Sequence, residues 1–347
     1  MQIRPLIVAL WSVLTLTPGT LDAQPVRDAF RRANPSVVLI RTTGRAATPG
    51  SSSEKAAQAQ GVGSGVLVSA DGKVVTAAHV VKSEAAIEVS FLDGEPIQAS
   101  VVWMAPSADL ALLQLARVPP AAVVATFGNS DLLETGDQVF TIGAPYGANH
   151  SLAVGWVSAR RLPSPVYEDA TPLELLQTDL SVFGGNSGGP LLNVDGEVVG
   201  IVTHVLSGDG AASGPSFSVA GNVVKRLLLD ERRTWFGVES FMLEGPLAEA
   251  FNLPQPAGLL VQSVSPASLA AKLGLRGGTV QAAIADVPVF LGGDVLIEIL
   301  GVPVVASPRF MSTFLAALDK VTAGDTVTAR VWRAGRVVSL DAVVPSP

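Results

Sequence analysis

Residues 185–190 read GNSGGP, a serine between glycines, and the apolar residues Leu191 and Leu192 follow. A serine in a turn ahead of an apolar strand is typical of a nucleophile displayed at a bend of a β fold. Glycine reaches backbone conformations that other residues resist, so Gly185 predicts a sharp turn just before Ser187. The run alone is also compatible with an ordinary turn, so residues elsewhere in the chain decide between the two.

Two upstream residues supply the partners that a serine nucleophile needs. His79 lies in TAAHVV at residues 76–81, and Asp109 lies in SADLALL at residues 107–113. A histidine activates the serine hydroxyl by taking its proton, and an aspartate fixes the tautomer of that histidine. The order His, Asp, Ser is that of chymotrypsin. We therefore predict that His79, Asp109 and Ser187 are the catalytic residues.

The reaction also needs donors for the oxyanion that develops on the substrate. The backbone N–H groups of Gly185 and Ser187 are predicted to point together at that oxygen, because Gly185 can adopt the strained conformation required. Loss of one such donor typically costs about 3–4 kcal/mol of transition-state stabilisation. The glycine-rich run therefore predicts an oxyanion hole as well as a nucleophile.

The composition indicates a globular, loop-rich, mainly β protein with room for about two or three domains. Of 347 residues, 48% are hydrophobic and 15% charged, with 34 Gly and 24 Pro. The net charge of −7 gives no electrostatic reason to bind nucleic acid. The chain has no cysteine, which excludes disulfides and metal-thiolate sites. We expect no metal or organic cofactor.

The first 23 residues have the pattern of a secretory signal peptide. Arg4 gives a positive start, and residues 6–16 are an apolar stretch that is short for a membrane span. Cleavage after Ala23 is expected, and an uncleaved membrane anchor is the alternative. Either outcome places the protein outside the cytoplasm.

These motifs resemble those of the HtrA/Deg serine proteases, which are quality-control enzymes of the bacterial envelope and of organelles. The resemblance covers roughly residues 24–347 and is carried by residues 63–66, 74–81, 109–113, 142–147, 177–179, 185–193 and 196–201. It implies a chymotrypsin-like double antiparallel β-barrel followed by a small α/β PDZ domain. It also implies an ATP-independent periplasmic endopeptidase that acts on unfolded or misfolded polypeptides and assembles as a homotrimer or larger.

The expected domains are a signal peptide over 1–23, an N-terminal segment and mobile loop over 24–62, a trypsin-like protease domain over 63–232 and a PDZ domain over 235–347. Residues 24–33 are predicted to be helical. Phe30 on that helix is a candidate trimer contact by resemblance, and packing on its own domain is equally compatible. Residues 43–62 are predicted to be a loop, and residues 221–232 a helix that ends the protease domain.

The resemblance places Ser181 where trypsin carries a carboxylate, so no preference for Lys or Arg is expected. It also implies that Val182 and Val205 line a small apolar pocket, which predicts cleavage after small aliphatic residues. Such a pocket discriminates poorly between near neighbours. His204 either narrows this pocket or is a partly exposed residue at a strand end. Asp179 is expected to be structural rather than catalytic.

One segment departs from the family pattern. Residues 180–184 read LSVFG, where HtrA enzymes usually have Ala-Ala-Ile-Asn-Pro or similar. The departure puts activation behaviour in doubt, because this loop can rest in an inactive shape in the family. Residues 160–172 resemble the segment that senses activators. A chaperone or peptide-binding scaffold with little cleavage is therefore the alternative function, and a processing protease for one regulator is a third.

The C-terminal part resembles a single PDZ domain, which binds peptide C-termini by strand addition and holds the carboxylate with backbone N–H groups. Its carboxylate-binding loop is expected at Trp235, Phe236, Gly237 and Val238. Residues 277–291 are longer than the common pattern and predict an extra hairpin. Residues 310–318 predict a second helix beside the groove.

Overall fold

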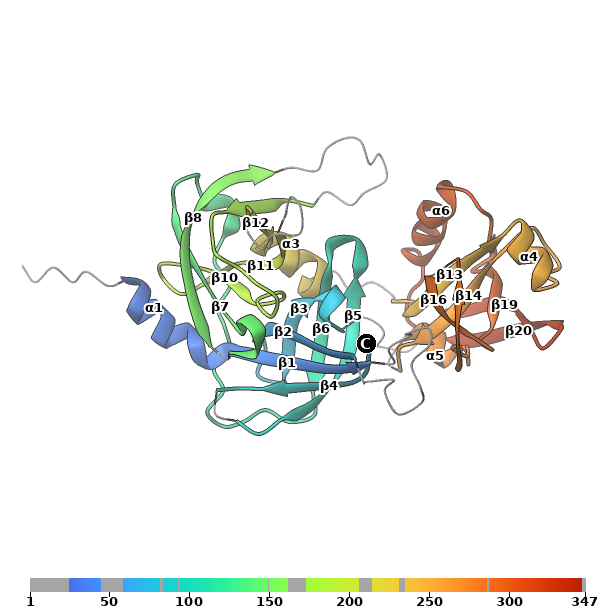
Figure 1. The fold of residues 1–347 in the computed structure, drawn as a ribbon, viewed down its shortest axis with the longest axis horizontal. Helices are drawn as coiled ribbons and strands as arrows, with labels where there is room; N and C mark the ends of the chain where they lie inside the picture. Colours follow the sequence, from blue (N-terminus) through green and yellow to red (C-terminus); the bar gives the residue numbers. More distant parts are fainter. Residues whose placement is uncertain are drawn as a thin grey trace, which may run out of the picture.

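The computed structural model describes residues 25–44, 59–81, 84–92, 94–148, 150–161, 173–205, 214–230, 235–266, 268–285 and 287–344. The chain forms a larger lobe of two β-barrels and a smaller C-terminal lobe, shown in red and orange at the right of Figure 1. The predicted signal peptide over 1–23 and most of the predicted loop over 43–62 lie outside the described residues.

The first barrel is closed and antiparallel, with its core at the centre of six strands. Ile40, Leu67 and Leu113 are fully buried there. A hairpin turn at Gly72, with φ of +95°, joins the second and third strands. The strands, in order around the barrel, are β1 (Val37–Gly44), β2 (Ala59–Leu67), β3 (Lys73–Ala77), β6 (Leu110–Leu115), β5 (Ile97–Ala105) and β4 (Glu84–Ser90).

The first barrel extends beyond the expected protease boundary at residue 63. Strand β1 pairs with both β2 and β4 and closes the barrel, so residues 37–44 belong to it. Strand β2 begins at Ala59, inside the segment 43–62 that the sequence analysis assigned to a loop. The small residues of that segment have low strand propensity, so the sequence pattern did not predict a strand there. Low propensity does not prevent pairing, and Gly61 lies opposite Thr42 in the sheet.

The second barrel is also closed and confirms the predicted double-barrel fold. Phe140, Ile142, Leu176 and Ile201 are fully buried in its core. Its strands, in order, are β10 (Pro190–Asn193), β11 (Val198–Val205), β12 (Ser216–Ala220), β9 (Leu175–Thr178), β8 (Ser151–Arg161) and β7 (Gln138–Gly143).

Helical segments close the ends of the barrels. The predicted helix over 221–232 is present as α3 (Gly221–Lys225), which continues as a π-helix over Arg226–Asp230. Helix α1 (Pro25–Ala33) packs on the second barrel, where Phe30 is partly buried against the core. The remaining short helices are η1 (Asn34–Ser36), α2 (Ala78–Val81), η2 (Pro106–Ala108), η3 (Ser130–Leu132) and η4 (Pro145–Gly147).

The C-terminal lobe is a small α/β unit with its own core, which includes Phe310, Phe314 and Leu318 of helix α6 (Arg309–Leu318). The extra hairpin predicted over 277–291 is present. The sheet has the order β13 (Val238–Glu244), β14 (Ala257–Val264), β17 (Val295–Ile299), β19 (Thr326–Arg333) and β20 (Arg336–Val343), and β18 (Val302–Pro303) pairs with β17. The hairpin strands are β15 (Val280–Ile284) and β16 (Val287–Leu291), and the other helices are α4 (Pro246–Ala250) and α5 (Leu269–Lys272).

A search of the described ranges found no helix of the length and apolar character needed to cross a bilayer.

Candidate active site

The three predicted catalytic residues come from both barrels. His79 lies in α2, directly after strand β3, and Asp109 lies between η2 and β6 of the same barrel. Ser187 lies in the turn before β10 of the second barrel. The Ser64 N–H donates to the Ser187 carbonyl over 2.8 Å, so β2 of the first barrel contacts the nucleophile turn directly.

The histidine and aspartate form a tight pair. The Asp109 Oδ2 atom lies 2.7 Å from His79 Nδ1, and Asp109 Oδ1 accepts from the His79 backbone N–H over 2.9 Å. Asp109 has a left-handed backbone, with φ of 52°, and its carbonyl accepts from the Ala78 N–H. The hydrogen bond with Asp109 raises the pKa of His79 above its ordinary value of 6.5, although burial opposes the shift. Asp109 thereby fixes the imidazole and favours its protonated form.

The serine hydroxyl is hydrogen-bonded to a backbone carbonyl rather than to this pair. Ser187 Oγ donates to the Thr203 carbonyl over 3.3 Å. Among the residues that the structure describes, no hydrogen bond joins Ser187 to His79. Hydrogen bonds of this kind are often loose or misaligned before substrate binds.

The turn before the serine leaves two donors unused. Gly185 has φ of +104°, and a side chain there would place a Cβ atom 2.0 Å from the Ala144 carbonyl oxygen. Within the described residues, neither the Gly185 N–H nor the Ser187 N–H donates to a protein acceptor. These are the two groups that the sequence predicts for the oxyanion hole, and they are free to receive a substrate oxygen.

Ser64 is a residue of this site that the sequence analysis did not single out. Its buried hydroxyl donates to the Gly185 carbonyl over 2.7 Å and accepts from the Ala144 N–H over 3.1 Å. The Ser64 carbonyl accepts from the Thr76 hydroxyl over 2.7 Å. Ser64 therefore holds the peptide unit between Gly185 and Asn186 in one orientation. The only signal in the sequence was its place between Gly63 and Gly65.

The comparisons with known proteins agree with this geometry. A model described as a trypsin-like peptidase domain matches residues 63–201. A protein of Pseudomonas fulva described as "Probable periplasmic serine endoprotease DegP-like" is 38% identical over 245 residues, which are 68% of this chain and 50% of that protein. A protein of Chlamydia trachomatis with the same description is 33% identical over 293 residues, which are 81% of this chain and 53% of that protein.

The solved structures give the same result over nearly the whole chain. The structure described as the HtrA-type protease AlgW with tripeptide is 27% identical, with a TM-score of 0.51, and the match covers 92% of this chain and 97% of that one. The chain belongs to the HtrA/Deg family. It spans about half the length of the curated relatives that it matches.

The residues expected to form the specificity pocket of this HtrA/Deg chain are only partly described. Val182 is buried in the core of the second barrel, and Ser181 is exposed. Val205 and His204 lie in β11, and their side chains lie outside the described residues. Asp179 accepts from the Trp156 N–H over 2.6 Å, which agrees with the structural role predicted for it.

The expected carboxylate-binding loop of this HtrA/Deg chain lies at the start of strand β13. The carbonyls of Trp235, Phe236 and Gly237 accept backbone hydrogen bonds from the segment around α5. Within the described residues, the N–H groups of Phe236 and Gly237 donate no hydrogen bond. Gly237 has φ of +73°, a conformation that suits glycine. Val238 begins the strand.

No group of three or more His, Asp or Glu side chains suited to holding a metal ion occurs among the described residues.

Proposed function

We propose that the chain is an ATP-independent serine endopeptidase. The observation that carries the proposal is the pair of hydrogen bonds that the Asp109 carboxylate accepts from His79, combined with the two free N–H donors of Gly185 and Ser187. Ser187 Oγ attacks the scissile carbonyl carbon and His79 Nε2 takes its proton. The N–H groups of Gly185 and Ser187 stabilise the resulting oxyanion. His79 then protonates the leaving amine, and water hydrolyses the acyl-enzyme.

We further propose unfolded or misfolded envelope proteins as substrates, cut after small aliphatic residues. The exposed Ser181 brings no charge to the pocket wall, which supports an apolar preference. Val182 and Val205 stay the predicted pocket residues. The DegP-like relatives are described as periplasmic, which supports the periplasm or cell envelope as the location.

A peptide C-terminus is the proposed ligand of the C-terminal lobe, which we propose to be a PDZ domain over 235–347. A cavity of about 600 Å³ lies between Phe236 and Val238 on one side and helix α6 on the other. Phe236 and Gly237 line this cavity, and their N–H groups, which donate no hydrogen bond within the described residues, suit a carboxylate. Ala105 and Pro106 of the first barrel also line this cavity, so a bound peptide would lie near the segment that precedes Asp109.

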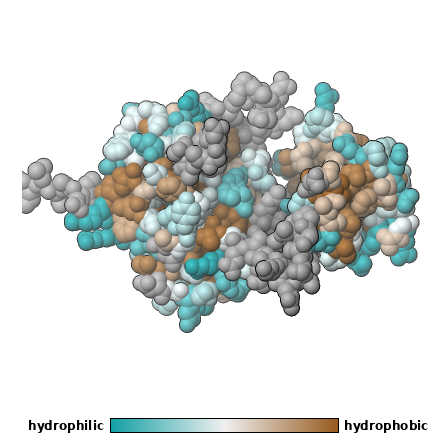
Figure 2. Space-filling view, in the orientation of Figure 1, coloured by the Kyte–Doolittle hydropathy of each residue, from teal (hydrophilic) through white to brown (hydrophobic). Residues whose placement is uncertain are grey.

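We propose assembly as a homotrimer or larger. Strand β8 exposes three alternate apolar side chains, with Leu152 44%, Val154 40% and Trp156 49% exposed. Figure 2 shows hydrophobic residues gathered at the end of the molecule where α1 and β8 lie. Contiguous apolar surface of this kind marks interaction sites. Analytical ultracentrifugation of the wild type and a Trp156→Ser variant tests the assembly.

Digestion of β-casein, with mass spectrometry of the cut sites, tests the enzymatic proposal. We expect cuts after Val, Ala, Ile or Leu that disappear in the Ser187→Ala variant. Cuts that persist in this variant, or cuts after charged residues, would contradict the assigned nucleophile or pocket.

A chaperone or peptide-binding scaffold is the second candidate function. The observation in its favour is that the Ser187 hydroxyl donates its hydrogen bond to the Thr203 carbonyl and not to His79. Protection of a client from aggregation, measured equally in the wild type and in Ser187→Ala, would support this function. Absence of casein cleavage by the wild type, even with added C-terminal peptides, would favour it over the enzyme.

A further inference from the structure

Two aromatic side chains meet beside the turn that carries the nucleophile. The ring centroids of Tyr146 and Phe183 are 5.8 Å apart, with the ring planes at 33°. Tyr146 lies in η4, after strand β7, and Phe183 lies between β9 and β10, so the contact joins two loops of the second barrel. Tyr146 is 80% exposed and Phe183 37% exposed. The two rings therefore stabilise the contact between these loops rather than the barrel core.

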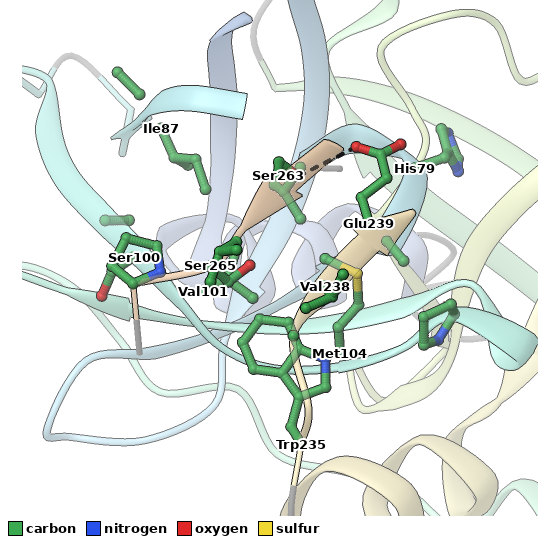
Figure 3. Close-up of a pocket in the computed structure, with 18 of the residues that line it drawn as sticks. His79, Ile87, Ser100, Val101, Met104, Trp235, Val238, Glu239, Ser263 and Ser265 are labelled. Atoms are coloured by element: carbon green, nitrogen blue, oxygen red, sulfur yellow. Dashed lines mark hydrogen bonds between the residues drawn. The ribbon is translucent and has the colours of Figure 1, made fainter. Parts of the chain in front are cut away.

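This contact is separate from the cavity between the first barrel and the C-terminal lobe, which Figure 3 shows. His79, Trp235 and Ser263 are among the residues that line that cavity, and neither Tyr146 nor Phe183 belongs to its lining. The aromatic contact is thus a feature of the second barrel and not of the boundary between the lobes.

Phe183 is the first residue of the turn that contains the Gly185 oxyanion donor. The Asn186 N–H donates to the Phe183 carbonyl over 3.0 Å, which closes a β-turn over residues 183–186. The central peptide unit of this turn joins Gly184 to Gly185. In a β-turn this unit has two orientations, which place the third residue at a φ of about +80° or of about −90°. Gly185 has φ of +104°, and the other orientation would reverse the direction of its N–H.

The Tyr146 backbone holds this peptide unit in the observed orientation. Its N–H donates to the Gly184 carbonyl over 2.8 Å. The carbonyl and the N–H of one peptide unit point in opposite directions, so this bond also fixes the direction of the Gly185 N–H. Tyr146 itself has φ of 51°, a conformation that residues other than glycine adopt where their surroundings impose it. The contact with the Phe183 ring is one such constraint.

We propose that Phe183 and Tyr146 are positioning residues for the oxyanion hole. Their ring contact keeps the Tyr146 N–H against the Gly184 carbonyl, and this bond keeps the Gly185 N–H directed at the substrate oxygen. The proposal rests on the protease function proposed above. Ser64 holds the peptide unit on the other side of Gly185, so both peptide units that meet at this glycine are fixed. The phenyl ring in the unusual segment LSVFG thereby acquires a function.

Steady-state kinetics on a peptide with a small aliphatic residue before the cut is the first test. We expect Phe183→Ala to lower kcat about three- to tenfold with KM nearly unchanged, a range that matches the usual contribution of one aromatic pair. Phe183→Tyr keeps the ring and should keep kcat within about twofold of the wild type. Tyr146→Ala should resemble Phe183→Ala, and the double variant should lose no more than the larger single loss. Leu132→Ala, which removes an exposed side chain from another loop, is the matched control.

A peptidyl trifluoromethyl ketone distinguishes a positioning role from a general effect on structure. Ser187 Oγ adds to the ketone carbon, its proton passes to His79, and the ketone oxygen becomes an oxyanion in the hole. The inhibition constant should rise in Phe183→Ala by about the same factor as kcat/KM falls. The affinity for the uncleaved peptide, measured in Ser187→Ala with and without Phe183→Ala, should stay the same.

The outcomes separate this inference from the protease function. Wild-type cleavage with equal kcat and equal inhibition constants in Phe183→Ala would overturn the positioning role and leave the protease standing. A loss of affinity for the uncleaved peptide that equals the loss of kcat/KM would also overturn it, because Phe183 would then act in substrate binding. A wild-type protein that neither cleaves nor forms the ketone adduct would overturn the protease function, and this inference with it.

Discussion

The Ser64 hydroxyl donates a 2.7 Å hydrogen bond to the Gly185 carbonyl and so joins the first barrel to the oxyanion turn of the second. Ser64 is fully buried, and the same hydroxyl accepts from the Ala144 N–H. Because the Gly185 carbonyl is held by Ser64, the Gly185–Asn186 peptide unit, which lies between the two proposed oxyanion donors, cannot rotate without breaking a buried hydrogen bond. The turn that carries the proposed oxyanion donors is therefore held by residues of both barrels.

Substitution of Ser64 by alanine should lower kcat about tenfold, with a smaller effect on KM. The change removes the group that orients the Gly185 peptide, while the oxyanion donors themselves remain. Steady-state kinetics on a peptide with a small aliphatic residue before the cut measures this. Ser69→Ala, which removes a turn hydroxyl that accepts from the Lys73 N–H and bonds to Asp71, is the matched control and should keep wild-type kcat. Equal kcat for the wild type and Ser64→Ala would show that Ser64 has no orienting role.

Adjacent glycines give a second prediction. Gly185→Ala should lower kcat by about 10²–10³, because the new Cβ atom would collide with the Ala144 carbonyl and displace an oxyanion donor. A Cβ atom at Gly184 meets nothing within 4 Å, so Gly184→Ala should retain most of the activity. Similar losses in both variants would mean that general loop flexibility, rather than the geometry of Gly185, matters.

The pH dependence follows from the His79–Asp109 pair. His79 must be neutral to act as a base, and its pKa lies above 6.5 because of the hydrogen bond with Asp109. We expect kcat/KM to rise with pH, with a midpoint above 6.5. The stabilisation from this pair is complete below the unfolded pKa of His79 and is lost as pH rises through the raised value.

Asp109→Asn should lower kcat about 10⁴-fold, as in other serine proteases with this triad, and should move any residual midpoint downward. A pH–rate profile of both proteins measures the shift. A midpoint at or below 6.5 in the wild type would contradict the assignment of the raised pKa to His79.

A buried ion pair in the C-terminal lobe predicts a stability difference. The Arg333 guanidinium donates hydrogen bonds to both carboxylate oxygens of Asp294, over 2.6 and 2.7 Å, and Asp294 is 1% exposed. Arg333→Met would leave that carboxylate without its cation and should cost about 3 kcal/mol or more. Arg330→Met breaks the exposed pair with Glu298 and should cost less than about 1 kcal/mol. Urea unfolding followed by tryptophan fluorescence compares the two, and equal losses would contradict the account.

The turn before Ser187, the hairpin and the second helix of the C-terminal lobe depend on local sequence patterns, and the sequence predicts them correctly. The run 185–190, with Gly185 before Ser187, predicts the positive φ that the structure has, because few other residues tolerate it. The hairpin over 277–291 and the helix over 310–318 were also predictable, since the first segment is longer than the family pattern and the second has an apolar face.

Features that depend on contacts between distant segments were not predictable. The Ser64–Gly185 hydrogen bond joins residues 121 positions apart, and no local pattern specifies it. Strand β2 begins in a stretch of small residues whose pairing depends on β1. The cavity that Ala105 and Pro106 share with Phe236 arises only when the C-terminal lobe packs beside the first barrel.

Labelling with a fluorophosphonate tests the central claim, that Asp109 and His79 activate Ser187, most directly. The reagent forms a phosphorus–oxygen bond with an activated serine and releases fluoride. We predict one label per chain, located at Ser187 by peptide mass spectrometry, and its absence in His79→Ala and Ser187→Ala. A folded wild-type protein that takes no label at Ser187, with or without added C-terminal peptides, or that keeps the label in His79→Ala, would contradict the account.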